Sequence, residues 1–219
     1  ISTPTTAYTT YSHPQAIDSV RVVALKTDFD RTARLVEIDL RSGSERLISH
    51  VGAVSTRPAL GRDGRLWWTE YRRSVLWGER YDSRLCWIDL EKGRTHSIAT
   101  AANVLYPTPI EGDSLAWVEY APEGRYTIVT GRAGEGKALM SKPLGEEIHG
   151  LAWDDTTRKL YYIGLGDDGM YLGSIDEQGG DKLLTQPAYV SMSDLRAEGG
   201  RLYCGSIRSG RDEAHTFDL

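Results

Sequence analysis

The sequence predicts an all-β protein, a β-propeller of four-stranded antiparallel blades with about five blades visible. A sequence motif, an apolar strand beside a turn that contains Gly or Asp, recurs five times. Its aligned apolar residues are Val22, Leu66, Leu115, Leu160 and Leu202. The intervals of 44, 49, 45 and 42 residues match the length of a four-stranded blade. Strand-forming Tyr and Trp number 12 and 6, and 23 Gly with 8 Pro supply turns.

We expect one propeller domain over residues 1–219, with repeats at approximately 12–50, 51–100, 101–145, 146–187 and 188–219. The last repeat stops without a fourth strand, and residues 1–11 are a possible closing strand. Residues 2–8 are therefore predicted to pair with the strand that ends at Leu219, which would cover an open sheet edge. A closed five-blade ring and an arc of a larger propeller both remain open. The start at Ile1 and the stop after a strand phrase lead us to expect a piece of a longer protein.

The second repeat shows its four strands most clearly. Residues 54–60 are predicted as the first strand, and Asp63-Gly64 as a tight turn. In the second strand, residues 65–71, apolar side chains fall on both faces, so the sheet must be covered on both sides, as in stacked blades. Residues 84–90 and 95–99 follow as the third and fourth strands, after a connection of twelve residues, 72–83.

The other repeats follow the same order with looser turns. Their predicted second and later strands are residues 115–120, 126–130 and 138–140 in repeat three, 160–164, 170–175 and 182–184 in repeat four, and 202–207 and 214–219 in repeat five. Asp39, Asp89, Asp176 and Asp218 stand at equivalent places after an apolar strand. A carboxylate there is expected to accept backbone amides of the following turn rather than to bind a ligand.

Composition narrows the classes of partner. The 26 basic and 31 acidic residues are spread without long runs, which predicts no nucleic-acid partner. No stretch approaches the 18 or so apolar residues of a membrane span, so we expect no direct membrane insertion. Cys86 and Cys204 lie within apolar strand phrases and are predicted to be buried and unpaired.

Three sequence segments together carry a family resemblance. They are Asp63-Gly64-Arg65-Leu66-Trp67-Trp68 with Ile88-Asp89-Leu90-Glu91-Lys92-Gly93, and Ile38-Asp39-Leu40-Arg41-Ser42-Gly43. This pattern resembles the TolB-like propeller repeats, related to WD40 repeats, of secreted and envelope proteins of Gram-negative bacteria. The resemblance implies a periplasmic, outer-membrane-associated or secreted location. Repeats four and five lack the Asp-Leu-x-x-Gly turn of this pattern; in repeat four, for example, Asp176 is followed by Glu177-Gln178-Gly179.

A narrower likeness joins residues 68–83 and 117–126 to the propeller segment of large bacterial envelope proteins. In those proteins the propeller follows a peptidase-like region and precedes an outer-membrane part. This resemblance implies that other domains of a parent chain are partners of the propeller.

Catalytic motifs are absent from the sequence. There is no Gly-x-Ser-x-Gly elbow, and Ser174 and Ser206 fall within predicted strands. The five histidines show no His-Glu-x-x-His spacing, so neither a metal site nor a cofactor is predicted. Glu146, Glu147 and His149 precede a first strand and are expected in a solvated loop. The weakest alternative for the function is a hydrolase that holds a metal ion in the central channel of the propeller. Asp167-Asp168-Gly169 is predicted to be a hairpin turn.

The connection 72–83 is the predicted binding segment. Its Arg72, Arg73, Trp77, Arg80 and Tyr81 combine arginine with aromatic side chains, as interface anchors do. The alternative is that Trp77 and Tyr81 fold back onto their own blade. The predicted function is a non-catalytic module that binds a protein, peptide or glycan within a larger protein. The alternative is an accessory substrate-gating domain of a peptidase or hydrolase whose catalytic unit lies outside these residues.

Overall fold

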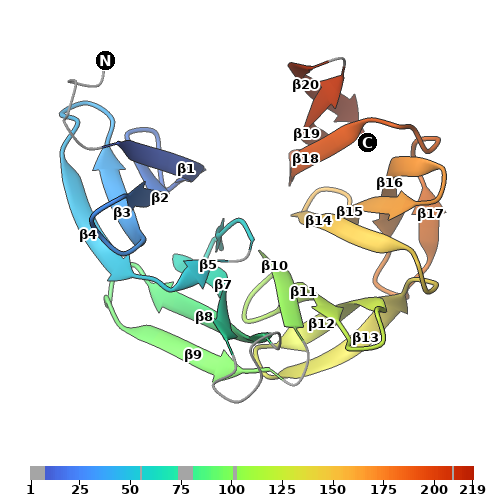
Figure 1. Cartoon of the computed structure of the whole chain (residues 1–219), viewed down its shortest axis with the longest axis horizontal. Coiled ribbons are helices and arrows are strands. Elements are labelled where there is room, and N and C mark those ends of the chain that lie inside the picture. The colour runs from blue at the N-terminus through green and yellow to red at the C-terminus, as the bar shows by residue number, and fades with distance from the viewer. Residues whose placement is uncertain (1–7, 55, 74–80, 101–102, 209) are drawn as a thin grey trace. The chain divides into compact units, whose positions relative to one another are not determined.

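A computed structural model describes residues 8–54, 56–73, 81–100, 103–208 and 210–219. The chain divides into two compact units, residues 1–99 and residues 100–219. Each unit consists of antiparallel sheets that follow one another along the chain (Figure 1).

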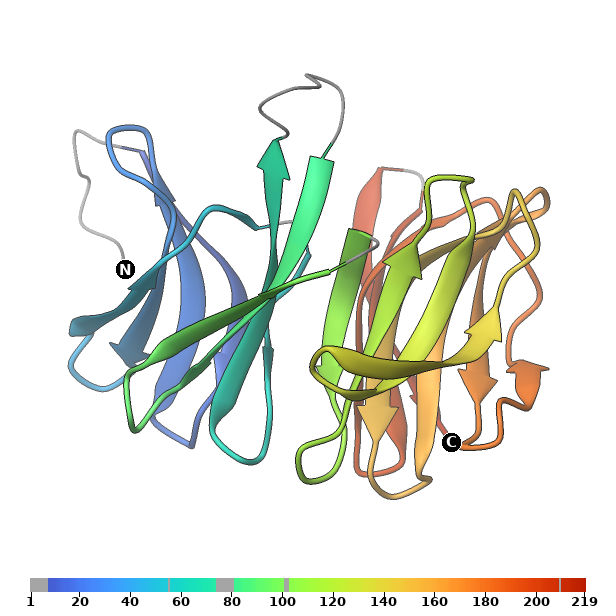
Figure 2. The same cartoon turned by 90° about the horizontal axis from the view of Figure 1, so that it is seen from below.

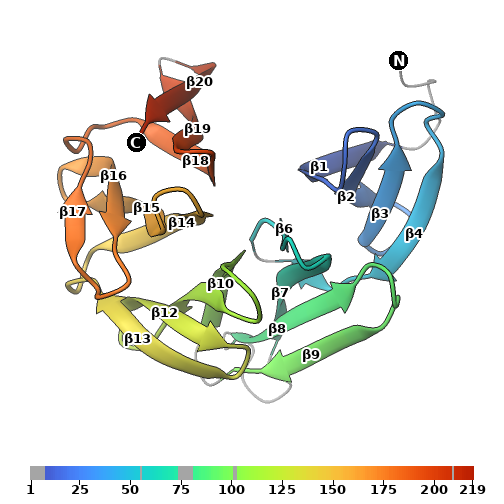
Figure 3. The same cartoon turned by 180° about the vertical axis from the view of Figure 1, so that it is seen from behind.

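The first unit holds two sheets, blade 1 and blade 2. Blade 1 has the strand order β1-β2-β3-β4, and blade 2 has β5-β7-β8-β9, with β6 also paired to β7 (Figure 3). The strands are β1 (Thr9–Ala16), β2 (Arg21–Asp28), β3 (Arg34–Asp39), β4 (Glu45–His50), β5 (Ala53–Val54), β6 (Ala59–Leu60), β7 (Arg65–Arg73), β8 (Tyr81–Asp89) and β9 (Thr95–Ala99).

The second unit holds three sheets, blades 3 to 5, whose neighbours contact each other in chain order (Figure 2). Their strand orders are β10-β11-β12-β13, β14-β15-β16-β17 and β18-β19-β20. The strands are β10 (Asn103–Pro109), β11 (Leu115–Tyr120), β12 (Tyr126–Arg132), β13 (Glu135–Ser141), β14 (Glu147–Asp154), β15 (Lys159–Gly166), β16 (Gly169–Ile175), β17 (Asp181–Leu183), β18 (Ser191–Glu198), β19 (Arg201–Arg208) and β20 (Arg211–Asp218).

The predicted fold class, an all-β propeller of four-stranded antiparallel blades, is confirmed. Among the described residues the fifth sheet has three strands, as the missing fourth phrase predicts. The predicted partner of its last strand, residues 2–8, lies outside the described residues except for Tyr8.

Two element boundaries in blade 2 differ from the prediction. The first strand, expected over residues 54–60, is split into β5 and β6. The pairing of β7 with β8 continues through Arg72↔Asp82 to Arg73↔Tyr81, so the expected twelve-residue connection shortens to residues 74–80. The charged side chains after Tyr71 concealed this extension, because they end the apolar alternation while the backbone remains paired.

The second strand of a blade is its buried centre. In β7 the side chains of Leu66, Trp67, Trp68 and Thr69 are all at most 5% exposed, although successive residues point to opposite faces. Ala116, Trp117 and Val118 of β11 are equally buried. Both faces of these sheets are therefore covered, as the sequence predicts.

The turns after the third strands use their aspartates as expected. Asp39 Oδ1 accepts the amides of Arg41 and Ser42, and Asp89 Oδ1 accepts those of Glu91 and Lys92. Asp176 likewise accepts the amides of Gln178 and Gly180. Asp218 differs, because its carboxylate pairs with the Arg201 side chain at 2.9 Å. The three turn aspartates thus have a local structural role.

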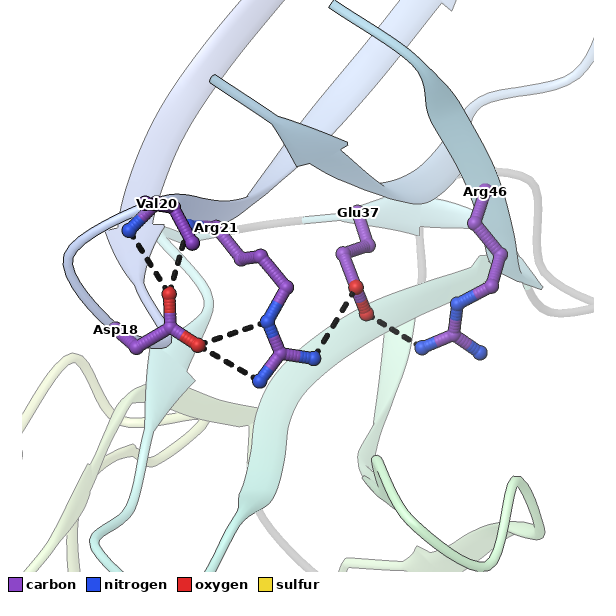
Figure 4. Close-up of polar contacts among 5 residues, drawn as sticks. All are labelled: Asp18, Val20, Arg21, Glu37 and Arg46. Carbon is purple, nitrogen blue, oxygen red and sulfur yellow. Dashed lines mark hydrogen bonds and ion pairs between the residues drawn. The ribbon is translucent and has the colours of Figure 1, made fainter. Parts of the chain in front are cut away.

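A chain of alternating charges runs across blade 1 (Figure 4). Asp18 accepts the amides of Val20 and Arg21 and pairs with the Arg21 guanidinium at 2.7 Å. Arg21 also contacts Glu37 at 3.4 Å, and Glu37 pairs with Arg46. The Val20 amide, followed by the Arg21 side chain, lowers the pKa of Asp18. Because most of these side chains are exposed, we assign the chain of charges a small effect on stability.

Both cysteines are buried and free, which confirms that prediction. Burial raises the pKa of Cys86 to about 12 and also raises that of Cys204. Neither thiol is activated as a nucleophile.

A buried lysine joins the sheets of blades 3 and 4. Lys142 Nζ donates to the Tyr162 hydroxyl at 2.7 Å and pairs with Asp181 at 3.0 Å, while lying 4.5 Å from the centre of the Tyr162 ring. Tyr162 in turn donates to Asp181 at 2.6 Å. The Tyr162 ring lies over Gly173, where an added Cβ would stand 2.2 Å from the ring atom Cζ. Glycine at position 173 is therefore required for the ring to reach the lysine.

Gly173→Ala is expected to destabilise the protein by about 1–3 kcal/mol, because Tyr162 must move away from Lys142. The matched control is Gly166→Ala, whose Cβ would lie 3.7 Å from Glu146 Cγ, an ordinary contact. Urea unfolding of the two variants measures the difference. Equal stability of both variants would contradict the packing described.

A second buried charge joins blades 4 and 5. Asp154 is 1% exposed, and its Oδ1 accepts the Gly200 amide at 3.1 Å. Its Oδ2 accepts the Thr157 amide at 2.8 Å and the Thr157 hydroxyl at 2.9 Å. Burial opposes ionisation, but the Gly200 and Thr157 donors outweigh it, so the pKa of Asp154 lies below its ordinary 3.8. The ionised carboxylate thus links the end of β14 to the turn between β18 and β19.

Asp154→Asn is expected to lower the unfolding free energy by about 2 kcal/mol at pH 7. The Asn side-chain NH2 group would face the Thr157 amide and hydroxyl, which are donors as well, so hydrogen bonds would be lost. A lowered pKa in the folded state means that the ionised group stabilises above its unfolded pKa. The gap between wild type and variant should therefore close as the pH falls through the folded pKa of Asp154. Unfolding free energies from pH 7 to pH 3 measure it, with Asp168→Asn as the exposed control. A gap independent of pH would contradict this role.

Candidate functional site

The first strand of nearly every blade carries the same irregularity. The pairing register shifts between Ser12 and Gln15 in β1, between Leu105 and Thr108 in β10, between Ile148 and Gly150 in β14, and between Ser193 and Arg196 in β18. In blade 2 the corresponding place is the interruption between β5 and β6. Such β-bulges re-aim side chains and are common beside functional sites.

Three of these bulges hold a residue other than glycine in the left-handed conformation. His13, Tyr106 and Asp194 have φ values of 53°, 50° and 53°. This conformation costs most side-chain-bearing residues about 1–2 kcal/mol, because Cβ approaches the next carbonyl, and it costs less for Asp and His. In β14 the bulge falls at His149, before Gly150. Local strain repeated at equivalent positions points to a surface shaped for binding.

In the second unit the three bulges lie on neighbouring strands. The Thr108 hydroxyl, just after the β10 bulge, is 3.3 Å from the Leu151 carbonyl, just after the β14 bulge. A Cβ on Gly150 would lie 3.4 Å from Leu195 Cβ in the β18 bulge. Each of these strands forms one edge of its sheet, opposite β13, β17 or β20 (Figure 1). We call Tyr106, His149 and Asp194, with Glu147, the bulge row.

The bulge row combines three kinds of polar group. His149 Nε2 is 2.8 Å from Glu147 Oε2, and both side chains are partly exposed. Asp194 is exposed and accepts a hydrogen bond from Ser193 at 3.3 Å, while the Tyr106 ring packs partly against the core of blades 3 and 4. A phenol, an imidazole–carboxylate pair and a second carboxylate can donate and accept hydrogen bonds in several directions. This arrangement suits the recognition of a polar ligand.

The sequence placed Glu146, Glu147 and His149 in a solvated loop, and for two of them this is wrong. Glu147 and His149 belong to β14, whose bulge turns them out of the regular alternation. Glu146 precedes the strand and accepts a hydrogen bond from the Tyr171 hydroxyl at 2.8 Å. Asp167-Asp168-Gly169 forms the predicted hairpin turn, since Gly166 pairs with Gly169.

The predicted binding segment is placed only in part. Arg72 is exposed near the end of β7, and Arg73 and Tyr81 form the last backbone pair of β7 and β8. Trp77 and Arg80 lie outside the described residues. A binding role for these five residues stays a prediction.

A serine and a histidine meet in blade 5. The Ser206 hydroxyl lies 2.7 Å from His215 Nε2, and Glu213 Oε2 is 3.6 Å from the same nitrogen. In a catalytic triad the carboxylate holds the other ring nitrogen, Nδ1, and so orients the base. Glu213 cannot orient His215 in this way. Ser206 also lies within a regular strand, without the strained turn of a nucleophile elbow.

Across the described ranges, no group of three or more His, Cys, Asp or Glu side chains could hold a metal ion. Within the same ranges, no helix is long and apolar enough to cross a membrane.

No family model matches the chain, and no curated protein matches its sequence. Solved structures match it in fold. The Pyrococcus horikoshii acylaminoacyl peptidase is 13% identical with a TM-score of 0.66, over 95% of this chain and 37% of that chain. The β-propeller domain of the Trilobed protease from Pyrococcus furiosus is 12% identical with a TM-score of 0.67, over 95% and 67%. TolB from Acinetobacter baumannii is 15% identical with a TM-score of 0.62, over 94% and 54%.

These similarities define the class of protein as a β-propeller and confirm the TolB-like resemblance at the level of fold. At such identities the likeness shows the fold alone. The chain spans 37% of the length of the acylaminoacyl peptidase that it matches.

Asp194→Gly tests whether the bulge row is strained. Glycine adopts the left-handed conformation without penalty, so we expect the variant to gain up to about 1 kcal/mol of unfolding free energy. Asp212→Gly, in the regular strand β20, is the control and should lose about 0.5–1 kcal/mol. Chemical denaturation of both variants decides. A loss at position 194 as large as at position 212 would show that Asp194 is not strained.

Proposed function

We propose that this chain is a single non-catalytic propeller domain that binds a protein, peptide or glycan ligand. The observation that carries the proposal is the bulge row, in which neighbouring first strands place different polar side chains at equivalent bulges. Regular buried sheets fix the positions of these bulges, so the side chains can vary without loss of the fold. Arg72, Arg73, Trp77, Arg80 and Tyr81 form a second proposed contact region in the first unit.

The chemistry of the bulge row favours a ligand rich in hydrogen-bonding groups. Glu147 and Asp194 accept hydrogen bonds, His149 can donate or accept, and the Tyr106 ring offers an apolar face. Peptides and glycans carry hydrogen-bonding groups for the carboxylates and the imidazole, and apolar surface that can pack on the Tyr106 ring. The structure of a nidogen/laminin complex includes a propeller of this fold, which supports a protein ligand as one member of this class.

The proposed setting is a larger protein of the bacterial envelope, periplasmic, outer-membrane-associated or secreted. The TolB-like fold supports this location. The second candidate function is an accessory domain that gates or orients substrate for a peptidase unit elsewhere in the parent chain. It is favoured by the peptidase matches, in which this chain corresponds to 36% and 37% of the matched chains.

The first test is binding of the purified chain to peptide and glycan arrays, followed by titration of each hit. The double variant His149→Ala, Asp194→Asn should bind a ligand of this site with an affinity at least about tenfold lower, because truncation of a hot-spot residue costs at least about 1–2 kcal/mol. Asp168→Asn, on the exposed hairpin of blade 4, is the matched control. Arg72→Ala with Trp77→Ala and Arg80→Ala tests the second region separately. Ligands that tolerate both sets of changes in a folded protein would contradict the proposal.

The second test addresses catalysis. The purified chain is expected to hydrolyse neither aminoacyl esters nor peptide substrates, because Ser206 and His215 lack an orienting carboxylate. Turnover that disappears in Ser206→Ala while the fold persists would contradict a non-catalytic module.

A further inference from the structure

Four side chains of the second unit gather around a single ammonium group. They are Tyr162 of β15, Tyr171 of β16, Asp181 of β17 and Glu146, which directly precedes β14. We call these four side chains the ammonium cage. The group that the cage holds is Nζ of Lys142, which directly follows β13.

The contacts of Lys142 replace the water that its ammonium group loses. Nζ lies 2.7 Å from the Tyr162 hydroxyl and 3.0 Å from Asp181 Oδ2. Glu146 Oε2 is 3.8 Å away, close enough for charge attraction. The centres of the Tyr162 and Tyr171 rings are 4.5 Å and 5.4 Å from Nζ, and such ring faces attract a desolvated cation. Since the Lys142 side chain is only 6% exposed, these contacts carry most of the stabilisation of its charge.

The cage has hydrogen bonds of its own that do not involve the lysine. Tyr162 donates to Asp181 Oδ1 at 2.6 Å, and Tyr171 donates to Glu146 Oε2 at 2.8 Å. The two rings meet edge to face, with 80° between their planes. Burial raises the pKa of both tyrosines, so their hydroxyl groups keep the protons that they donate. The groups that contact Nζ are therefore positioned by one another.

Two glycines make room for the rings of the cage. Gly164 is the cross-strand neighbour of Tyr171, and Gly173 is that of Tyr162. An added Cβ at Gly164 would lie 2.3 Å from Tyr171 Cζ, and one at Gly173 would lie 2.2 Å from Tyr162 Cζ. The same pairing of a tyrosine with a glycine thus occurs twice on neighbouring positions of β15 and β16. Both pairs serve one site.

We propose that the ammonium cage is a binding site for primary alkylammonium groups, and that Lys142 is its ligand within the chain. Most of the cage belongs to blade 4, whereas Lys142 extends the last strand of blade 3. The Asp181 and Glu146 side chains are 37% and 34% exposed, so the carboxylate side of the cage is open to solvent. A free amine can enter from this side once the lysine side chain is removed. The proposal does not depend on ligand binding at the bulge row.

The chemistry of the cage selects the class of cation. A primary ammonium group has three N–H donors, and the cage offers it a hydroxyl and two carboxylates. A quaternary ammonium group has no N–H to donate, so the Tyr162 hydroxyl and Asp181 would each lack their partner. A neutral alcohol of the same length would not be attracted by the carboxylates. The cage therefore favours a protonated primary amine over both.

Rescue of Lys142→Ala by an amine is the first test. n-Propylamine replaces the atoms that this substitution removes beyond Cβ. At a constant ionic strength, about 100 mM of the protonated amine should raise the melting temperature of the variant by about 2–4 °C, if its Kd is about 20 mM. n-Propanol and propyltrimethylammonium should not do so. Lys137→Ala, at an exposed position of β13, is the matched control and should not respond to the amine, nor should the unaltered chain.

The second test uses the unaltered chain and so does not require that Lys142→Ala folds. Lysines are acetylated with acetic anhydride, and peptide mass spectrometry follows the reaction at each position. Lys142 should react at least about tenfold more slowly than Lys137, because its amine is enclosed until the structure opens locally. Equal rates at the two positions would overturn the proposal. So would a folded Lys142→Ala that n-propylamine stabilises no more than n-propanol does.

Discussion

Burial of both faces of the second strands is the constraint on which the rest of the structure depends. A strand such as β15, with Tyr161 and Tyr162 on opposite faces, exposes a large apolar surface unless another sheet covers each side. Stacked sheets meet this requirement without helices. The same rule explains blade 5, whose second strand β19 is covered on the Leu202 and Cys204 side and exposed at Tyr203 and Ile207.

Stacking leaves the first strands free to be irregular. Once the second and third strands hold the blades in place, a bulge in β10, β14 or β18 disturbs few buried contacts. The buried links at Lys142 and Asp154 reinforce this division, because each joins adjacent blades away from the bulges. Polar side chains and backbone strain can therefore accumulate on the bulge row, where we propose that a ligand binds.

The sequence predicted what is local and periodic. The repeated apolar strands predicted the blades. The turns were predicted from Asp39, Asp89 and Asp176, because the hydrogen-bond partners of these carboxylates lie two to four residues away. The bulges were missed because the first strands carry no clear apolar alternation whose interruption could have marked the extra residue. His13-Pro14 and Tyr106-Pro107 carry a signal that could have revealed two of them, since proline cannot donate to a regular ladder. The contacts of Asp154 with Gly200 and of Lys142 with Tyr162 join separate repeats, so no local pattern could predict them.

Amide hydrogen exchange measured residue by residue tests this account most directly. It predicts that amides of the doubly buried segments in β7, β11 and β15 exchange slowest and only through global unfolding. Amides of the outer strands β4, β9, β13 and β17 should exchange through smaller openings. If the outer strands are as strongly protected as β7, β11 and β15, burial of both faces is not what holds these sheets together.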